Sequence, residues 1–133
     1  MVTLVDSNVI FDFLTEDETW FEWSASMLQK SATDGTLAIN PIIYAEIGSR
    51  YHTVEDLDTD LAAEYFTRAP LPWEAAFLAG RAFAQYKKRG GVKRSTLPDF
   101  YIGAHAAVTG MHLLTRDPKR YRTYFPKVRL VSP

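Results

Sequence analysis

Four acidic residues occupy positions where a fold of alternating strands and helices could bring their side chains together: Asp6, Glu46, Asp99 and Asp117. Carboxylates that converge without a cationic partner repel one another, so such a cluster needs a compensating charge. Oxygen ligands suit the hard cations Mg²⁺ and Mn²⁺, which keep several waters and need only a few protein carboxylates. A cation held in this way activates water and neutralises charge on a phosphodiester. The four acids therefore predict a metal-dependent enzyme that acts on phosphate.

Each acid also has a structural interpretation that needs no metal. Asp6, Asp99 and Asp117 stand where helices could begin, and aspartate is a good N-cap. Glu46 differs, because helical spacing turns it toward the apolar side of its segment, where an unpaired carboxylate is costly. A salt bridge from Arg50 would satisfy Glu46 and would remove this argument for a metal site.

Short polar side chains stand next to these acids in the sequence: Ser7, Asn8 and Thr115. Hydroxyl and amide groups in such places can orient metal-binding carboxylates, although helix capping would also explain Ser7 and Asn8. Other catalytic patterns are absent from the sequence. The histidines lack a zinc-motif spacing, no glycine-rich phosphate loop occurs, and no G-x-S-x-G elbow is present. His105 is expected to be a packed helix residue.

The elements that must position the acids follow from the apolar runs. Strands are expected over 2–5, 36–39, 112–115 and 128–131, with a short strand over 68–72 that prolines interrupt. Helices are expected over 9–14, 18–32, 54–66, 73–89, 99–109 and 119–124, with another beginning at Asn40-Pro41 and a basic loop over 90–98. This order predicts an α/β fold with a central parallel sheet of four to five strands and helices on both faces. Ligands bind beyond the carboxyl ends of such strands, where Asp6 and Asp117 fall.

Composition predicts one globular domain over residues 1–133. No cysteine is present, so disulfides and a thiol nucleophile are excluded. The sequence shows no signal-peptide pattern and no apolar run of the roughly 20 residues that cross a bilayer, which predicts a soluble cytoplasmic protein with no membrane partner.

The charges are distributed unevenly along the chain. Residues 1–80 carry 3 basic and 14 acidic side chains, whereas residues 81–133 carry 12 basic and 2 acidic ones, namely Asp99 and Asp117. A basic half whose only acids belong to the predicted site suggests a surface that attracts a polyanion. The alternative is that each half has a solvated face, and folding could also interleave the two halves.

Four motifs in order give the chain a family resemblance: VDSNVI at 5–10, NPIIYAEI at 40–47, LPDFYIGAHA at 97–106 and LLTRD at 113–117. With these motifs the sequence resembles PIN-domain ribonucleases, in particular the VapC toxins of toxin–antitoxin pairs, over nearly its full length. The resemblance implies that Asp6, Glu46, Asp99 and Asp117 hold Mg²⁺ or Mn²⁺ for RNA cleavage, supported by Ser7 and Thr115. The predicted RNA contacts are Lys87, Lys88, Arg89, Lys93, Arg94 and Arg116.

The resemblance further implies a homodimer and a VapB-type antitoxin whose C-terminal tail covers the groove. The antitoxin's N-terminal domain would bind promoter DNA, so the chain would meet that DNA only through the antitoxin. One alternative is a PIN nuclease with a housekeeping role in RNA processing, which the small size of the chain disfavours. The other is a non-catalytic α/β signalling module, which would leave the positions of Glu46 and Asp99 unexplained.

Overall fold

Five parallel strands form one sheet in the order β3-β2-β1-β4-β5 in the computed structural model, which describes residues 1–94 and 96–133. The strands are β1 (Val2–Val5), β2 (Thr36–Ile39), β3 (Phe66–Arg68), β4 (His112–Leu114) and β5 (Leu130–Val131). The chain builds outward from β1 through β2 to β3 and then returns to the other side of β1 at β4. The strand order therefore reverses between β1 and β4, where an open α/β sheet binds its ligand.

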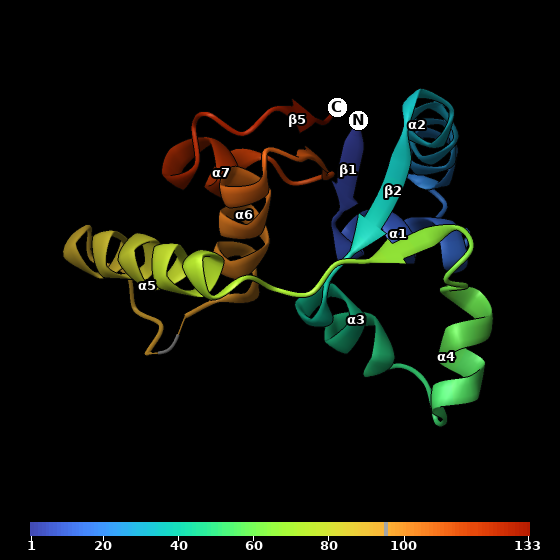
Figure 1. Cartoon of the computed structure of the whole chain (residues 1–133), viewed down its shortest axis with the longest axis horizontal. Coiled ribbons are helices and arrows are strands. Elements are labelled where there is room, and N and C mark those ends of the chain that lie inside the picture. Colours follow the sequence, from blue (N-terminus) through green and yellow to red (C-terminus); the bar gives the residue numbers. More distant parts are fainter. Residues whose placement is uncertain (95) are drawn as a thin grey trace.

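Within the described residues, seven helices connect the strands: α1 (Ser7–Leu14), α2 (Phe21–Asp34), α3 (Pro41–Gly48), α4 (Val54–Asp60), α5 (Trp73–Lys88), α6 (Pro98–Thr109) and α7 (Lys119–Tyr124). α1 and α2 lie on one face of the sheet, and α5, α6 and α7 lie on the other (Figure 1). The predicted fold class, a parallel sheet between helical layers, is confirmed. Among the described helices, none combines the length and the apolar character needed to span a membrane.

The central strands are short apolar runs because helices cover both of their faces. In β1, Leu4 and Val5 have no exposed surface, and neither do Leu113 and Leu114 in β4. Val5 is in register with Leu114, and the next amide, that of Asp6, donates to the Leu114 carbonyl at 2.9 Å. This pairing fixes where β1 ends, and so fixes Asp6 beside the end of β4.

Gly103 in α6 allows α7 to pack closely against that helix. A Cβ atom at this position would lie 2.4 Å from Cδ2 of Phe125 and 3.0 Å from Cδ1 of Tyr121. Any larger residue would push α7 outward, since real Cβ contacts are longer than this. Glycine at 103 therefore helps to bring the buried Tyr121 to the end of β1.

The predicted helix over 54–66 is wrong in its second half. Helix α4 ends at Asp60, and β3 then pairs in parallel with β2, with Phe66 opposite Leu37. Leu61, just after the helix, is fully buried, whereas Tyr65 is 69% exposed. The free edge of β2 supplies hydrogen-bond partners for this segment, and that long-range pairing outweighs the local helical pattern. The short strand accordingly begins two residues earlier than the predicted 68.

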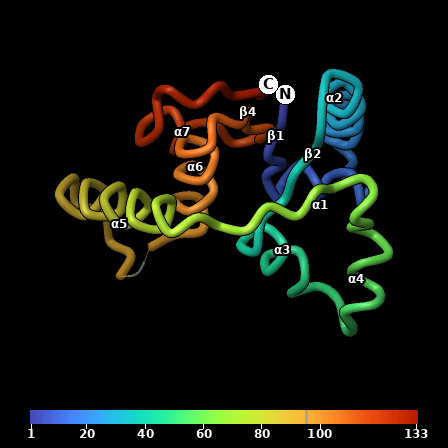
Figure 2. Tube along the Cα trace, in the orientation of Figure 1, coloured from blue at the N-terminus to red at the C-terminus, as the bar shows by residue number. Residues whose placement is uncertain are grey.

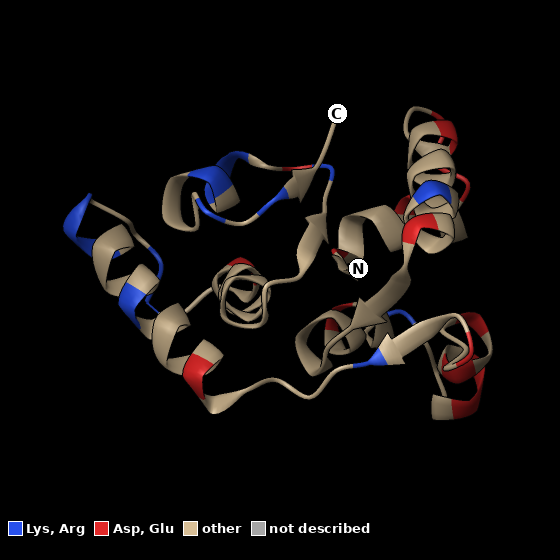
Figure 3. Ribbon diagram, turned by 45° about the horizontal axis from the view of Figure 1, so that its top comes forward, with Lys and Arg blue, Asp and Glu red and all other residues tan. Residues whose placement is uncertain are grey.

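The predicted loop over 90–98 links α5 to α6, and its residue 95 lies outside the described residues. The path of the chain places α5, α6 and α7 together at one side of the strands, with α2 and α4 at the opposite side (Figure 2). Lys and Arg residues gather on α5 and α7, and Asp and Glu residues on α2 and α4, as the blue and red stretches of the ribbon show (Figure 3). Folding therefore keeps most of the basic and acidic residues on opposite sides, although Arg116 of the basic half pairs with Asp12 of the acidic half.

Candidate active site

Asp6 follows β1 directly and is only 4% exposed. Two hydroxyl groups donate to its Oδ2 atom, from Thr115 Oγ1 at 2.8 Å and from Tyr121 at 2.9 Å. The Asn8 amide nitrogen lies 3.5 Å from the same oxygen. Asp6 precedes α1, but its side chain makes no capping bond to that helix. The N-cap alternative therefore does not explain this carboxylate.

Burial raises the pKa of Asp6 from the ordinary 3.8 to about 6. The hydroxyls of Thr115 and Tyr121 act in the opposite direction, and the negative charge of Asp99 adds to the rise. Near neutral pH the folded chain therefore holds a carboxylate whose negative charge is costly. A bound cation would stabilise the charged form of this carboxylate.

Glu46 projects from α3 toward the same site. The Ser7 hydroxyl donates to Glu46 Oε1 at 3.0 Å. Burial raises the pKa of Glu46, and the charges of Asp6 and Asp99 raise it further. Arg50 is not its partner, because the Arg50 guanidinium lies over the Phe11 ring at 4.4 Å. The salt-bridge alternative for Glu46 is thus removed.

Asp99 occupies the first turn of α6, where Leu97 and not Asp99 is the N-cap residue. Burial raises the pKa of Asp99, the charge of Arg120 lowers it, and the charge of Asp117 raises it again. Arg120 Nη1 lies 3.3 Å from Asp99 Oδ2. The prediction that the acids lack a cationic partner is therefore wrong for Asp99. Within residues 1–94 and 96–133, the other three acids of the site form no ion pair.

Asp117 is exposed in the turn after β4, ahead of the α7 N-cap Pro118. Its backbone N–H donates to Thr115 Oγ1 at 3.1 Å. The amide of Arg116, one residue earlier, donates to Asn8 Oδ1 at 3.1 Å. The turn that carries Asp117 is therefore bonded to the same polar side chains that contact Asp6.

The four predicted acids lie toward the carboxyl ends of the central strands. Among the predicted supporting residues, Ser7 bonds Glu46, and Asn8 and Thr115 bond Asp6. Among the described residues, no three acidic or histidine side chains form a ready-made ligand set for a metal ion. The donor chemistry nevertheless fits a hard divalent cation. Asp6, Glu46 and Asp99 have pKa values raised first by burial, and a neighbouring acid raises each of them further: Asp99 for Asp6, Asp6 and Asp99 for Glu46, and Asp117 for Asp99. Carboxylate oxygens are the ligands that Mg²⁺ and Mn²⁺ prefer.

Three residues of this region were not singled out as functional from sequence: Asp12, Arg120 and Tyr121. The Tyr121 hydroxyl bonds Asp6, and burial followed by the charge of Asp6 raises the pKa of Tyr121 well above its usual value. An aromatic residue in a short helix looks like any core residue in sequence, so only the packing of α7 reveals this contact. His105, by contrast, is buried as predicted, with its Nδ1 atom 3.1 Å from the Asn40 amide nitrogen.

The predicted RNA contacts fall into two groups. Lys87 and Lys88 end α5, and Arg89, Lys93 and Arg94 follow it at the surface, within the basic half (Figure 3). Arg116 lies elsewhere and has a partner. Its Nε and Nη2 atoms lie 2.8 and 3.1 Å from the two carboxylate oxygens of Asp12. Its guanidinium is therefore engaged inside the protein, unlike that of a free surface cation.

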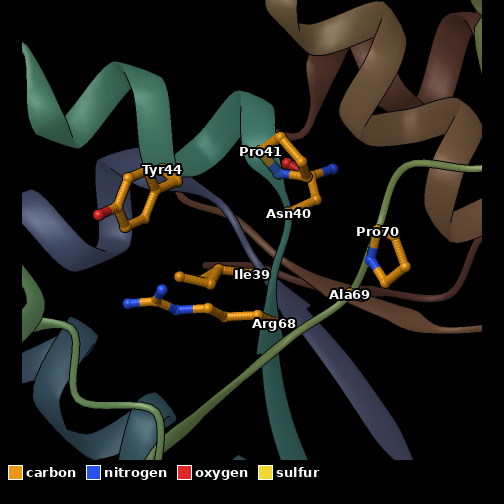
Figure 4. Close-up of a pocket in the computed structure, with 7 residues that line it drawn as sticks. All are labelled: Ile39, Asn40, Pro41, Tyr44, Arg68, Ala69 and Pro70. Atoms are coloured by element: carbon orange, nitrogen blue, oxygen red, sulfur yellow. The ribbon is translucent and has the colours of Figure 1, made fainter.

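A cavity of about 370 Å³ lies between α3 and the segment after β3. Tyr44 and Arg68 extend along one side of it, and Asn40, Pro41 and Pro70 lie at the other (Figure 4). None of the four acids lines this cavity. This cavity is therefore separate from the acidic cluster.

The sequence matches the PIN domain family over residues 3–126, and the chain belongs to that family. Its fold is similar to that of VapBC2 from Rickettsia felis bound to a DNA fragment from their promoter, with a TM-score of 0.75 and 18% identity over 99% of this chain and 98% of that chain. For VapBC-1 from nontypeable Haemophilus influenzae the TM-score is 0.74 at 16% identity, again over 99% and 98%. For a toxin–antitoxin complex from Klebsiella pneumoniae the TM-score is 0.69 at 23% identity, over 97% of this chain and 95% of that chain. No curated protein matches the chain. The family and fold predicted from the sequence motifs are therefore confirmed.

Proposed function

We propose that residues 1–133 act as one unit, a metal-dependent endoribonuclease, and that the chain is the toxin of a VapBC-type toxin–antitoxin pair. PIN domains are nucleases, which sets the reaction class. The observation that supports metal dependence is the group of Asp6, Glu46 and Asp99, whose pKa values are all raised by burial. Such a group is stable in its charged form only beside a cation.

In this proposal Asp6, Glu46, Asp99 and Asp117 hold Mg²⁺ or Mn²⁺. The cation would supply Lewis-acid activation of water and neutralisation of the phosphodiester. The chain's own groups keep the carboxylates ready for this role. The Thr115 and Tyr121 hydroxyls hold the Asp6 carboxylate in one orientation, and the Ser7 hydroxyl does the same for Glu46. Arg120, beside Asp99, supplies a positive charge at the rim where a phosphate would approach.

The toxin role draws on the fold shared with VapBC proteins, so an antitoxin is the proposed partner and the cytoplasm the proposed compartment. An antitoxin tail would cover the acidic site, and promoter DNA would be bound by the antitoxin alone. The housekeeping alternative would require no such partner. A small antitoxin gene beside this one, whose product relieves growth arrest caused by the chain, distinguishes the two roles.

The activity is tested with purified protein and total RNA in Mn²⁺. The wild-type chain should cleave RNA. In Asp99→Asn the cleavage rate should fall by at least about 100-fold, because the substitution removes a negative charge from the site while the side chain keeps nearly the same shape. Cleavage should also stop when EDTA is added. Mapping the cut ends identifies the RNA. If the wild type cuts nothing that the variant spares, the nuclease proposal is abandoned.

The basic residues after α5 are proposed to contact the RNA backbone. Neutralising Lys87, Lys88 and Arg89 together to glutamine should weaken RNA binding and flatten its dependence on salt, by about 0.7 in the log–log slope for each phosphate that is no longer neutralised. Binding titrations at several salt concentrations measure this slope. Lys30→Gln, in the acidic half, is the control and should leave the slope unchanged. An unchanged slope in the triple variant would return these residues to an ordinary solvated surface.

The homodimer is proposed to form through the start of α5. Trp73 and Phe77 lie one helical turn apart there, and they are 92% and 70% exposed. Exposed neighbouring aromatics of this size are typical of an interaction surface. Trp73→Asp and Phe77→Asp together should convert a dimer to a monomer in light-scattering measurements. Tyr65→Asp, at an equally exposed aromatic, should leave the dimer intact; a dimer that survives both changes, or a monomeric wild type, rules out this interface.

A further inference from the structure

Asp12 is a buried carboxylate outside the cluster of four acids. It lies in α1 and is 2% exposed. Arg116 donates to both of its oxygens, at 2.8 and 3.1 Å, and the Ser24 hydroxyl of α2 donates to Oδ2 at 2.8 Å. The Arg116 guanidinium also lies over the Trp20 ring, 5.4 Å from its centre. Asp12 is therefore fully paired, by a bidentate arginine and a hydroxyl.

Arg116 is held at two points by one face of α1. Asn8 and Asp12 are four residues apart in that helix, so their side chains lie one above the other. Asn8 Oδ1 accepts the backbone N–H of Arg116 at 3.1 Å, while Asp12 binds the guanidinium. One residue of the turn after β4 is thus fixed both through its backbone and through the end of its side chain.

The two neighbours of Arg116 belong to the proposed site. Thr115 donates to Asp6 at 2.8 Å, and the Asp117 N–H donates back to the Thr115 hydroxyl at 3.1 Å. A rotation of the backbone at 116 would move both of these groups. Because Arg116 alone among the three reaches the second turn of α1, its side chain sets how the turn sits over Asp6.

We propose that the Asp12–Arg116 pair is a positioning device, which holds the Thr115–Asp117 turn so that Asp117 and Asp6 present their carboxylates to the same cation. This inference rests on the proposed nuclease function and assigns to Arg116 a role different from RNA contact. A guanidinium suits the task because its planar fork grips both carboxylate oxygens, whereas a lysine ammonium is a point charge. Removing either partner would leave a buried charge without its counterpart.

The test compares Arg116→Lys and Asp12→Asn with the wild type in two measurements. Mn²⁺ affinity measured by calorimetry should fall about 10-fold or more in each variant, which is the usual effect of disturbing the residues behind a metal ligand. Cleavage kinetics should show kcat reduced to a similar extent, with KM for RNA within about twofold of the wild-type value. Combining both changes should cost no more than the worse single change, because they break the same pair.

The matched control is Arg68→Lys. Arg68 is also paired with a carboxylate, that of Asp58, and also lies over an aromatic ring, that of Tyr44, but at a surface away from the acids. This control should keep wild-type Mn²⁺ affinity and kcat. If Arg116→Lys does not fold, Ser24→Ala provides a milder test, since it keeps both charges and removes one donor to Asp12. It should lower Mn²⁺ affinity and kcat by about threefold, less than the arginine variant does, because the bidentate arginine still holds Asp12.

Four outcomes would overturn the inference. Folded variants with wild-type Mn²⁺ affinity and kcat would show that the pair has no positioning role. A raised KM with unchanged kcat would make Arg116 an RNA contact, and multiplicative effects in the double variant would show that the two residues act separately. A wild type that neither binds Mn²⁺ nor cleaves RNA would overturn the proposed function and the inference with it. If the wild type binds Mn²⁺ and cleaves RNA, any of the first three outcomes overturns the inference and leaves the proposed function standing.

Discussion

Asp6→Asn should lose RNA cleavage and, without metal, should be more stable than the wild type at neutral pH. Cleavage should fall by at least about 100-fold, because the substitution removes the most buried carboxylate of the site. Stability should rise because the same carboxylate is costly when charged. An amide has nearly the same shape, and its oxygen can still accept from the Thr115 and Tyr121 hydroxyls that now donate to Oδ2.

The pH dependence of this effect follows from the raised pKa of Asp6. Below about pH 3.8 the carboxyl is protonated in both the folded and the unfolded chain, so it does not affect stability. Between 3.8 and about 6 the folded chain keeps the proton and the unfolded chain does not, so stability falls as pH rises. Above about 6 the whole penalty is present, and the difference in pKa corresponds to about 3 kcal/mol.

Urea unfolding in EDTA at pH 4 and pH 7.5 measures this difference. The free energy of unfolding of Asp6→Asn should exceed that of the wild type only slightly at pH 4, and by about 3 kcal/mol at pH 7.5. Adding Mn²⁺ should stabilise the wild type and reduce the gap. Asp58→Asn is the control, because Asp58 has its pKa lowered, first by the Tyr44 hydroxyl, and its removal should bring no gain. An Asp6→Asn chain less stable than the wild type at pH 7.5 would contradict the argument from burial.

Thr115→Val should reduce cleavage at pH 7 by about 10- to 100-fold, the usual range for a residue that orients a metal ligand. The Thr115 hydroxyl donates to Asp6, accepts from the Asp117 N–H, and lies 3.4 Å from the Asn8 amide. Valine has nearly the same shape, but it can neither donate nor accept a hydrogen bond. The change should cost about 1–3 kcal/mol of stability, because it leaves the Asp117 N–H without its acceptor.

The same substitution should shift the acidic limb of the pH–rate profile to higher pH. Among the hydrogen bonds that lower the pKa of Asp6, that of Thr115 acts most strongly, so its loss raises this pKa further and delays ionisation. Initial rates from pH 5.5 to 9 measure the limb. Thr3→Val, at a buried threonine earlier in β1, is the control and should leave it in place. If the acidic limb does not move in Thr115→Val, the ionisation that controls the cleavage rate is not that of Asp6.

The short-range features of the fold could be predicted from the sequence. Asn40 followed by Pro41 indicated a helix start, and the Asn40 side chain does accept from the Ile43 amide at 2.9 Å. The helix over 54–66 was predicted wrongly because its second half depends on pairing with β2, where Phe66 lies opposite Leu37. A partner that distant along the chain leaves no periodic signal in the segment itself.

The sequence by itself indicated which acidic side chains could do chemistry, and that Asp6 and Asp117 would follow neighbouring strands of the sheet. Apolar runs that end in Asp6 and lead into Asp117 must be central strands, and parallel strands bring their carboxyl ends to one edge. Only the tertiary structure decided which groups contact each acid: the Tyr121 hydroxyl contacts Asp6, Arg120 lies beside Asp99, and Arg116 pairs with Asp12. The physical reason is that these contacts join residues 21 to 115 positions apart. Burial and neighbouring charge, which set the ionisation of the site, exist only once the helices have packed.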